Sequence, residues 1–489
     1  MSGDTAIATA VLLPAFGALI IALLGHLPNV RDAAMIGVAI VTFGIVYTLY
    51  PQVQSGAQPT LHLLEILPGL DLVFQVEPLG MLFALIASGL WILTSLYAIG
   101  YMRGHHEENQ TRFFAFFAVA ISAALAAAFS GNMLTLFFCY EVLTLSTYPL
   151  VTHHRTPEAL RAGRIYMGIL LSTSIGLLLF GVLLTYHVAG TLSFMPGGIL
   201  AGKATPLMTG ILLFLYAYGT GKAALMPIHR WLPNAMVAPT PVSALLHAVA
   251  VVKTGVFTIV KVVVYIFGVE HLSSTGFHIY LAYIAALTIV LSSLVAMTQD
   301  NLKARLAYST ISQLAYIVLG AALANAHGVI GAGLHIAMHA FGKITLFFCA
   351  GAIMVALHKT EISDMRGIGR QMPFTMAAFI IGSLSIIGVP PLGGSWSKWY
   401  LALGAADTGH LILVGVLMLS SLLNIAYLLP IPARAFFSEP THDDGHHGAG
   451  LHEAPLLCLI PLCLTALGCV LLFFFAEPLY QLIAPIVAH

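Results

Sequence analysis

The sequence predicts an all-α polytopic membrane protein with about 14 transmembrane helices. Three observations lead to this prediction: hydrophobic residues make up 59% of the 489-residue chain, charged residues make up only 8%, and the mean hydropathy is +0.95. Soluble domains carry roughly 25% charged residues, so this chain cannot coat soluble domains with charge. The net charge of +0 argues against a nucleic-acid-binding protein, and the high apolar content argues against a disordered chain.

The cysteines and the first residues of the chain fit this class. No two cysteines form a CxxC pair, and all lie in apolar runs, where a free cysteine behaves as a small hydrophobic residue. No basic segment precedes the first apolar run, so we expect a retained helix and not a cleaved signal peptide. The five cysteines are Cys139, Cys349, Cys458, Cys463 and Cys469.

Fourteen segments are long and apolar enough to be spans. A helix needs about 20 mostly apolar residues to cross the hydrocarbon core. Hydrophilic gaps separate these segments, and the two sizeable gaps cover residues 51–78 and 438–453. The predicted spans are residues 6–25, 33–50, 79–100, 112–130, 132–152, 162–188, 207–228, 242–268, 278–298, 302–323, 328–357, 373–404, 410–433 and 454–476.

The lysines and arginines test this span prediction. With the N-terminus placed outside, thirteen of the 19 basic residues fall in inner-side loops or helix ends, and only Lys203 falls on the outer side. This asymmetry follows the positive-inside rule, and it predicts that both termini face outside. The remaining basic residues lie within predicted spans: Lys222, Lys253, Lys261, Lys343 and Lys398.

Every basic residue in the middle of a predicted span is a lysine, whereas all arginines lie in inner-side loops or at the inner ends of helices. Arginine stays protonated in proteins, but a desolvated lysine can release its proton. Glu141 is the only acidic residue within a predicted span. Ionisable residues inside the membrane are costly and are candidates for a functional site, so the pattern favours proton movement. The alternative for Glu141 is the structural neutralisation of a buried lysine.

Two predicted spans are interrupted, and each carries a central lysine. Lys222 lies before Pro227 in the seventh span, and Lys398 follows Pro390 and Pro391 in the twelfth. Spans that are five apart cross in opposite directions, so the two breaks predict an inverted repeat and an ion pathway. The predicted regions are residues 1–105 (helices 1–3), 106–270 (first repeat, helices 4–8), 271–436 (second repeat, helices 9–13) and 437–489 (an inner-side His/Asp-rich loop and helix 14).

Titratable residues also line two unbroken spans. His335, His339 and Lys343 follow each other at intervals of four residues, so they form one stripe on a helix face. Such a stripe in a bilayer is typical of a proton relay. In the eighth span Lys253 is a further candidate. Lys261 and His247 in the same span are supporting candidates, and each has an alternative interpretation. Lys261 either takes part or extends to the headgroups, and His247 either takes part or is a satisfied core histidine.

Histidines outside the spans have two interpretations. The pairs His105-His106, His153-His154 and His446-His447 are either solvated loop residues or proton-collecting groups on the inner surface. Residues 442–447 contain His and Asp, but their spacing lacks the fixed geometry of a designed metal site. We therefore predict no metal site.

One long segment resembles a known family. Residues 229–235 read HRWLPNA, and residues 238–248 read APTPVSALLHA. This run resembles the hallmark of the antiporter-like membrane subunits of respiratory complex I, membrane-bound hydrogenases and Mrp-type cation/proton antiporters. The resemblance extends from about Glu77 to Arg434. It implies a subunit of fourteen helices with two inverted five-helix repeats.

The resemblance also implies roles for the intramembrane residues. Glu141 and Lys222 would form a coupling ion pair, Lys253 with His339 and Lys343 would bridge two half-channels, and Lys398 would be the terminal lysine. A lysine at this last position is similar to the large subunits of Mrp-type antiporters and to the distal antiporter-like subunit of complex I.

The function implied is proton translocation, with or without exchange for Na⁺, by one subunit of a multisubunit complex in a prokaryotic plasma (inner) membrane. The alternative is a proton-pumping subunit of a redox-driven complex, either NADH:quinone oxidoreductase-like or of the group 4 hydrogenase type. We expect no cofactor in this chain, so any redox enzyme activity would belong to partner subunits. The expected partners are other membrane subunits and the lipid bilayer, and no nucleic acid.

Overall fold

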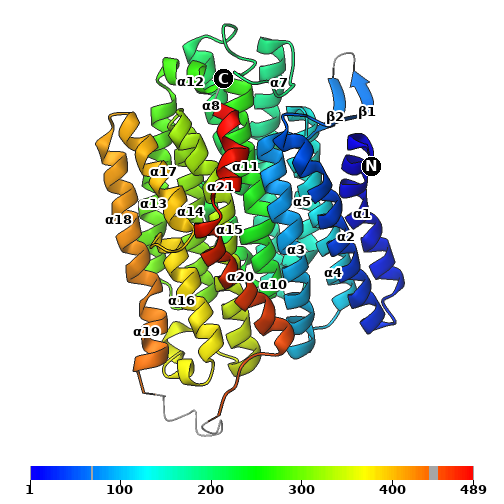
Figure 1. Cartoon of the computed structure of the whole chain (residues 1–489), viewed down its shortest axis with the longest axis vertical. Coiled ribbons are helices and arrows are strands. Elements are labelled where there is room, and N and C mark those ends of the chain that lie inside the picture. Colours follow the sequence, from blue (N-terminus) through cyan, green and yellow to red (C-terminus); the bar gives the residue numbers. More distant parts are fainter. Residues whose placement is uncertain (1, 68–69, 440–449, 488–489) are drawn as a thin grey trace.

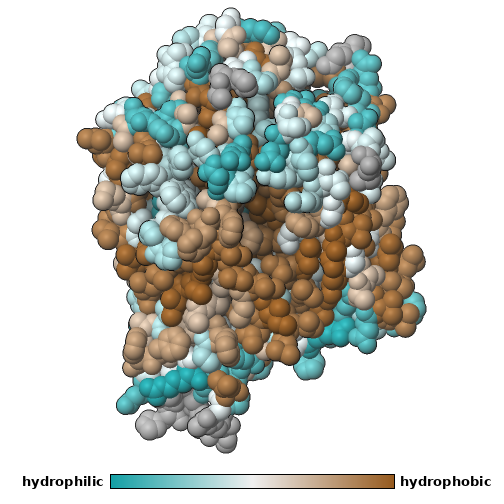
Figure 2. Space-filling model, viewed as in Figure 1, coloured by the Kyte–Doolittle hydropathy of each residue, from teal (hydrophilic) through white to brown (hydrophobic). Residues whose placement is uncertain are grey.

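The computed structural model describes residues 2–67, 70–439 and 450–487, without the side chains of residues 67, 246 and 247. The chain forms a bundle of long helices, with its N- and C-terminal ends both toward the upper end of Figure 1. An apolar belt crosses the bundle between more hydrophilic ends (Figure 2). Large apolar side chains are exposed on the surface of the helices, including Phe16, Leu183 and Met418. The predicted helical membrane class is therefore confirmed.

Among the described residues, the first half of the chain contains eight helices before the first break. They are α1 (Gly3–Leu23), α2 (Pro28–Gln54), α3 (Pro78–Gly104), α4 (Gln110–Ala128), α5 (Met133–Val151), α6 (Pro157–Thr173), α7 (Leu179–Ala189) and α8 (Pro206–Gly219). Short elements then lead into a central helix: α9 (Trp231–Asn234), α10 (Thr240–Ala244), α11 (Val251–Val262) and α12 (Val269–Thr275). Five-residue π-helical turns join α6 to α7 and flank α11.

The second half of the chain also consists mainly of long helices. Its helices are α13 (His278–Thr298), α14 (Leu302–Ala322), α15 (Ala326–Leu357), α16 (Pro373–Ile387), α17 (Gly394–Asp407), α18 (Leu411–Leu428), α19 (Pro430–Phe437), α20 (Leu456–Phe474) and α21 (Glu477–Ile483). Prolines begin many of these helices because proline lacks the N–H that would be unpaired in a first turn. Pro373 in α16 and Pro430 in α19 are examples.

All fourteen predicted spans coincide with helical segments. Ten described helices are long and apolar enough to cross a membrane, or eleven when the bent pair Val251–Phe267 and Val269–Thr275 counts as one span. Helices α8 and α16 have only 14 and 15 residues because each ends at a break. The total of fourteen crossings therefore stays a prediction.

A β-hairpin corrects the purely α-helical prediction. Strands β1 (Thr60–Leu67) and β2 (Leu70–Gln75) pair antiparallel within the gap of residues 51–78. The sequence places Pro-Gly between two short apolar runs, which is a turn signal that favours a hairpin. The runs are too short to span a bilayer, so the length criterion for spans does not detect them.

Two deeply buried helices, α11 and α15, carry most of the intramembrane titratable residues. Every residue of α11 is buried, including its two lysines. Helix α15 is buried along most of its 32 residues and packs against α14, α16, α17 and α20. Helices α11 and α15 also contact each other. The fold thus brings Lys253 and the α15 stripe together in the protein interior.

Candidate functional site

The first broken helix places Lys222 in the break itself. Helix α8 ends at Gly219, well before Pro227, and Lys222 lies in a short 3₁₀ turn of residues 221–223. A Cβ at Gly219 would come within 2.4 Å of the Leu178 backbone nitrogen, so the glycine permits close packing. The break is confirmed, but the prediction that Pro227 interrupts the helix was wrong because the helix already ends where this packing occurs.

Lys222 lies in an enclosed polar site that we call the first lysine cradle, formed by Tyr140 and Thr144 of α5. The Lys222 Nζ donates to the Tyr140 carbonyl oxygen at 2.9 Å and to Thr144 Oγ1 at 2.5 Å. It also lies 3.1 Å from the centre of the Tyr140 ring, a cation–π contact. Lys222 is 0% exposed, so these groups supply its surroundings.

The expected ion pair between Glu141 and Lys222 is not closed in this structure. Among the ion pairs of the described residues, none joins Lys222 to a carboxylate, and both carboxylate oxygens of Glu141 are buried without a hydrogen-bond partner. Glu141 is still near enough to act on Lys222 electrostatically. The lysine amine turns instead to the backbone carbonyl and hydroxyl of α5, which satisfy two of its donors.

Helix α11 holds the first break in place through a glycine. A Cβ at Gly255 would lie 2.5 Å from the Lys222 carbonyl carbon and 2.5 Å from the Ala223 nitrogen. The two backbones therefore approach as closely as glycine permits. The position of Lys222 depends directly on the helix that also carries Lys253.

The centre of the molecule contains a direct contact between two predicted residues. Lys253 Nζ on α11 lies 2.6 Å from His339 Nδ1 on α15. The His339 ring stacks on the His335 ring with centroids 5.8 Å apart. His335 Nδ1 lies 2.8 Å from Ser397 Oγ, and its Nε2 lies 3.1 Å from Gln313 Oε1. The stripe on α15 therefore joins polar groups from three neighbouring helices.

Lys343 extends this stripe toward the other end of α15. Its Nζ donates to Ser309 Oγ at 2.6 Å and approaches the Leu306 carbonyl oxygen at 3.5 Å. Lys343 also acts on Lys253 electrostatically. Both lysines are 0% exposed. Two buried lysines thus flank His339.

Lys398 occupies a second lysine cradle, formed by Ile387, Ser421 and Tyr316. Helix α16 ends at Ile387 and α17 begins at Gly394, so Pro390 and Pro391 lie in the break as predicted. Lys398 Nζ donates to the Ile387 carbonyl oxygen at 2.9 Å and to Ser421 Oγ at 3.1 Å. It lies 4.9 Å from the centre of the Tyr316 ring, and this ring stacks on His335 at 5.5 Å.

Lys398 also lines what we call the lateral groove, a cavity of about 520 Å³ between the second break and α18. The exposed walls of the groove are mainly apolar, with Met418 67% and Leu422 63% exposed. Lys398 is therefore only partly buried. The second cradle therefore opens to an apolar part of the surface.

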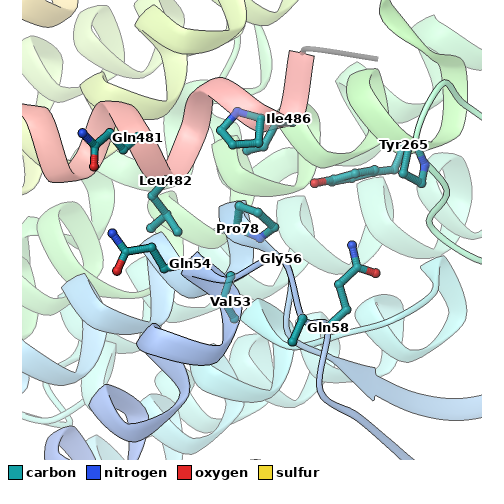
Figure 3. Close-up of a pocket in the computed structure, with 12 residues that line it drawn as sticks. Val53, Gln54, Gly56, Gln58, Pro78, Tyr265, Gln481, Leu482 and Ile486 are labelled. Atoms are coloured by element: carbon teal, nitrogen blue, oxygen red, sulfur yellow. The ribbon is translucent and has the colours of Figure 1, made fainter.

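Lys261 does not extend to the headgroups. It is 0% exposed, lies 3.2 Å from Glu77 Oε1 and donates to the Ser130 carbonyl oxygen at 2.7 Å. Glu77 also accepts from the Tyr265 hydroxyl at 2.8 Å and caps the start of α3. Tyr265 in turn lines a cavity of about 180 Å³ bordered by polar amides, shown in Figure 3. This buried ion pair ties α11 to α3.

Some predicted positions lie outside the described residues, and some residues of the site were not predicted. The His247 side chain and residues 442–447 lie outside the described part of the structure. Sequence reasoning missed the uncharged partners of the lysines, because it considered only ionisable groups. It also missed Glu77, which lies just before its span and gives only a helix-cap signal. The missed partners are Tyr140, Thr144, Ser309, Gln313, Tyr316, Ser397 and Ser421.

Comparisons with known proteins assign a family. A family profile described as NADH:quinone oxidoreductase/Mrp antiporter, TM, matches residues 130–424, and one described as NADH-Ubiquinone oxidoreductase (complex I), chain 5 N-terminus, matches residues 69–114. The chain is 32% identical over 411 residues to NADH-quinone oxidoreductase subunit L of Mycobacterium tuberculosis, covering 82% of this chain and 62% of that protein. It is 32% identical over 434 residues to NADH-quinone oxidoreductase subunit N of Desulforudis audaxviator, covering 86% and 84%.

Solved structures share the fold. A chain of the Mrp complex from Dietzia sp. DQ12-45-1b matches with a TM-score of 0.85 at 21% identity, covering 100% of this chain and 97% of that chain. A chain of the membrane-bound sulfane sulfur reductase, an archaeal respiratory membrane complex, matches with a TM-score of 0.85 at 24% identity, covering 99% and 98%. The resemblance seen in the sequence is confirmed: the chain belongs to the NADH:quinone oxidoreductase/Mrp antiporter family of antiporter-like membrane subunits.

Proposed function

We propose that this chain translocates protons through the membrane as one subunit of a multisubunit complex. The observation that carries the proposal is the polar line through the apolar belt. In this line Lys253 contacts His339, His339 stacks on His335, and His335 stacks on Tyr316 beside Lys398. Lysine and histidine can both bind and release protons, whereas arginine cannot.

In the proposed route, Lys222 controls the release of the proton. A buried ammonium is stable only while polar groups or an opposite charge compensate for lost hydration. The first cradle supplies a carbonyl and a hydroxyl, and Glu141 lies nearby with both oxygens unpartnered. Movement of Glu141 toward or away from Lys222 would change the free energy needed to keep Lys222 protonated. Released protons would pass toward Lys253, then His339 and Lys343, and finally Lys398.

We further propose fourteen crossings, both termini outside, and inverted repeats over residues 106–270 and 271–436. The two lysine cradles support the repeat, because each combines a backbone carbonyl, a hydroxyl and a tyrosine ring around one lysine at a helix break. The excess of basic residues in the loops of one side supports the orientation. A prokaryotic plasma membrane is the proposed location, since the relatives named above are prokaryotic.

The proposed partners are other membrane subunits, and two parent complexes remain candidates. The Mrp fold match favours an antiporter, with Na⁺ as the exchanged ion when one is exchanged. The likeness to NADH-quinone oxidoreductase subunits L and N favours a redox-driven complex, whose redox cofactors would belong to other chains.

Replacing Lys222 or Glu141 by alanine tests the proposal. We expect transport by the assembled complex to fall by about 10²-fold or more, the range set by loss of a proton-transferring group. Lys203→Ala is the matched control, because Lys203 lies outside this line and only donates to the Ala189 carbonyl oxygen. Near-normal transport by a fully assembled Lys222→Ala complex would contradict the proposal.

A further inference from the structure

Histidines from two pairs that are 48 positions apart in the sequence meet around one carboxylate. Glu107 lies between α3 and α4, and its side chain is only 6% exposed. His105 Nδ1 lies 3.2 Å from Glu107 Oε1, while His154 Nδ1 and His153 Nε2 lie 3.6 Å and 3.9 Å from Oε2. We call Glu107, His105, His153 and His154 the inner histidine cluster, because these loops are on the proposed inner side.

The inner histidine cluster separates two cavities. One, of about 460 Å³, is lined by the two loops that carry the cluster, residues 105–109 and 153–155. The other, of about 170 Å³, shares His105, Glu107 and His154 with the first and continues to Thr240 and Lys303. The cluster therefore borders a cavity on each side.

One face of α14 runs from the second cavity toward Lys343. Lys303 lines the cavity, and Glu107 acts on it electrostatically. Lys303, Leu306 and Ser309 follow at intervals of three residues, which places them on neighbouring positions of one helix face. Leu306 O and Ser309 Oγ are the two acceptors near Lys343 Nζ. The rise from Lys303 to Ser309 is about 9 Å.

The chemistry of the cluster suits proton exchange near neutral pH. Histidine is the side chain whose ordinary pKa lies in this range. His153 differs from its neighbours: burial, with the charges of His154 and Arg112, lowers its pKa to about 4, so it stays a neutral acceptor. The other charged groups that face the cavities are Glu108, Arg155, Lys303 and Lys359.

We propose that the inner histidine cluster is the proton-exchange site of this chain on the inner face, connected through the second cavity and Lys303 to Lys343. This inference rests on the proposed function. The step moves only a proton: water or a buffer acid gives it to an imidazole nitrogen, Glu107 holds the charge nearby, and the reverse step returns it. The competing interpretation is that the cluster only ties two loops together.

Buffer rescue separates these interpretations. We would measure the initial transport rate of the assembled complex in everted membrane vesicles, whose inner face is accessible, at about pH 8 in weak buffer, where free protons and protonated histidine are scarce. Glu107→Gln and the double variant His105→Gln/His154→Gln should slow transport several-fold. Imidazole added to the medium should restore most of the rate, because it carries protons to the second cavity.

The controls are His26→Gln, in an exposed inner loop, and His106→Asn, beside His105; both histidines lie outside the described ion pairs of Glu107. An unchanged rate in the cluster variants overturns the inference, and so does a loss that imidazole does not restore, which assigns a structural role. If Glu107→Gln does not assemble, His154→Gln alone provides the same test, since the His154 side chain is 36% exposed.

Lys222→Ala, measured in parallel, separates failure of this inference from failure of the proposed function. If Lys222→Ala stops transport while the cluster variants run normally, only the inner histidine cluster loses its role. If Lys222→Ala also transports normally, the proposed function itself fails, and the inference that rests on it fails too.

Discussion

The two lysine cradles are built alike but are enclosed differently. Around Lys222 and around Lys398 the structure places one backbone carbonyl, one hydroxyl and one tyrosine ring. Lys222 is 0% exposed and has Glu141 nearby. Lys398 is partly buried and lines the lateral groove. The residue after its cradle tyrosine is Ile317, whereas Glu141 follows the tyrosine of the first cradle.

The difference shows which parts of a proton site the backbone fixes. Lys222 sits in a break whose backbone is packed against Gly255 of α11, so its position depends on rigid neighbours. Lys398 sits in the regular helix α17 and reaches its cradle with a flexible side chain. We infer that the first cradle is sensitive to small changes in packing and that the second tolerates them.

The largest effect is expected when the backbone contact of the first cradle is disturbed. The new Cβ of Gly255→Ala would lie 2.5 Å from two backbone atoms of the break, so the turn that carries Lys222 must shift. Overpacking of this kind costs about 1–3 kcal/mol. We expect lower thermal stability of the purified complex and severe loss of transport.

Gly44→Ala in α2 is the control for this change, because no atom lies within 4 Å of its added Cβ. Normal transport by Gly255→Ala would show that the position of Lys222 is not set by α11. The contrast between a rigid first cradle and a flexible second one would then disappear.

A smaller effect is expected when each cradle loses its hydroxyl. Thr144→Val leaves Lys222 with an unmet donor in an enclosed space, which costs about 1–3 kcal/mol. Ser421→Ala should cost less than about 1 kcal/mol, because the open groove lets Lys398 find another acceptor. Thermal unfolding of the two purified complexes measures the difference, with Thr48→Val on exposed α2 as control. Equal losses of stability would mean that the enclosure of a cradle does not change the cost of removing its hydroxyl.

The sequence could predict which residues are titratable and where the helices break, but not how each lysine is satisfied. Periodicity places His335 and His339 on one face, and the structure stacks their rings. The contact of Lys253 with His339 joins two helices, and no local pattern encodes such a distance. Tyr140 and Ser421 are common residues in membrane helices, so their roles as lysine partners appear only once the fold brings them to a break.

The same limit explains the histidine pairs and the acid that caps α3. The sequence leaves these pairs either solvated or proton-collecting, because an offset of 48 positions gives no sign that His105 and His154 meet at Glu107. Glu77 precedes its span and therefore was not counted among intramembrane charges. In the folded chain it pairs with Lys261 at 3.2 Å. Whether a residue lies inside a predicted span does not decide whether its side chain is buried in the protein. Only the fold shows the burial.

The smallest effect concerns the tyrosine hydroxyls, since phenylalanine keeps the ring beside each lysine. The Tyr140 hydroxyl accepts from the Lys222 backbone N–H at 3.1 Å, so Tyr140→Phe should cost about 1 kcal/mol. The Tyr316 hydroxyl donates to Leu417 O at a longer 3.3 Å, and Tyr316→Phe should cost about 0.5 kcal/mol or less. Unfolding temperatures and transport rates of both complexes provide the measurement. If Tyr316→Phe impairs transport as much as Tyr140→Phe, its hydroxyl carries protons between His335 and Lys398, and the second cradle is as demanding as the first.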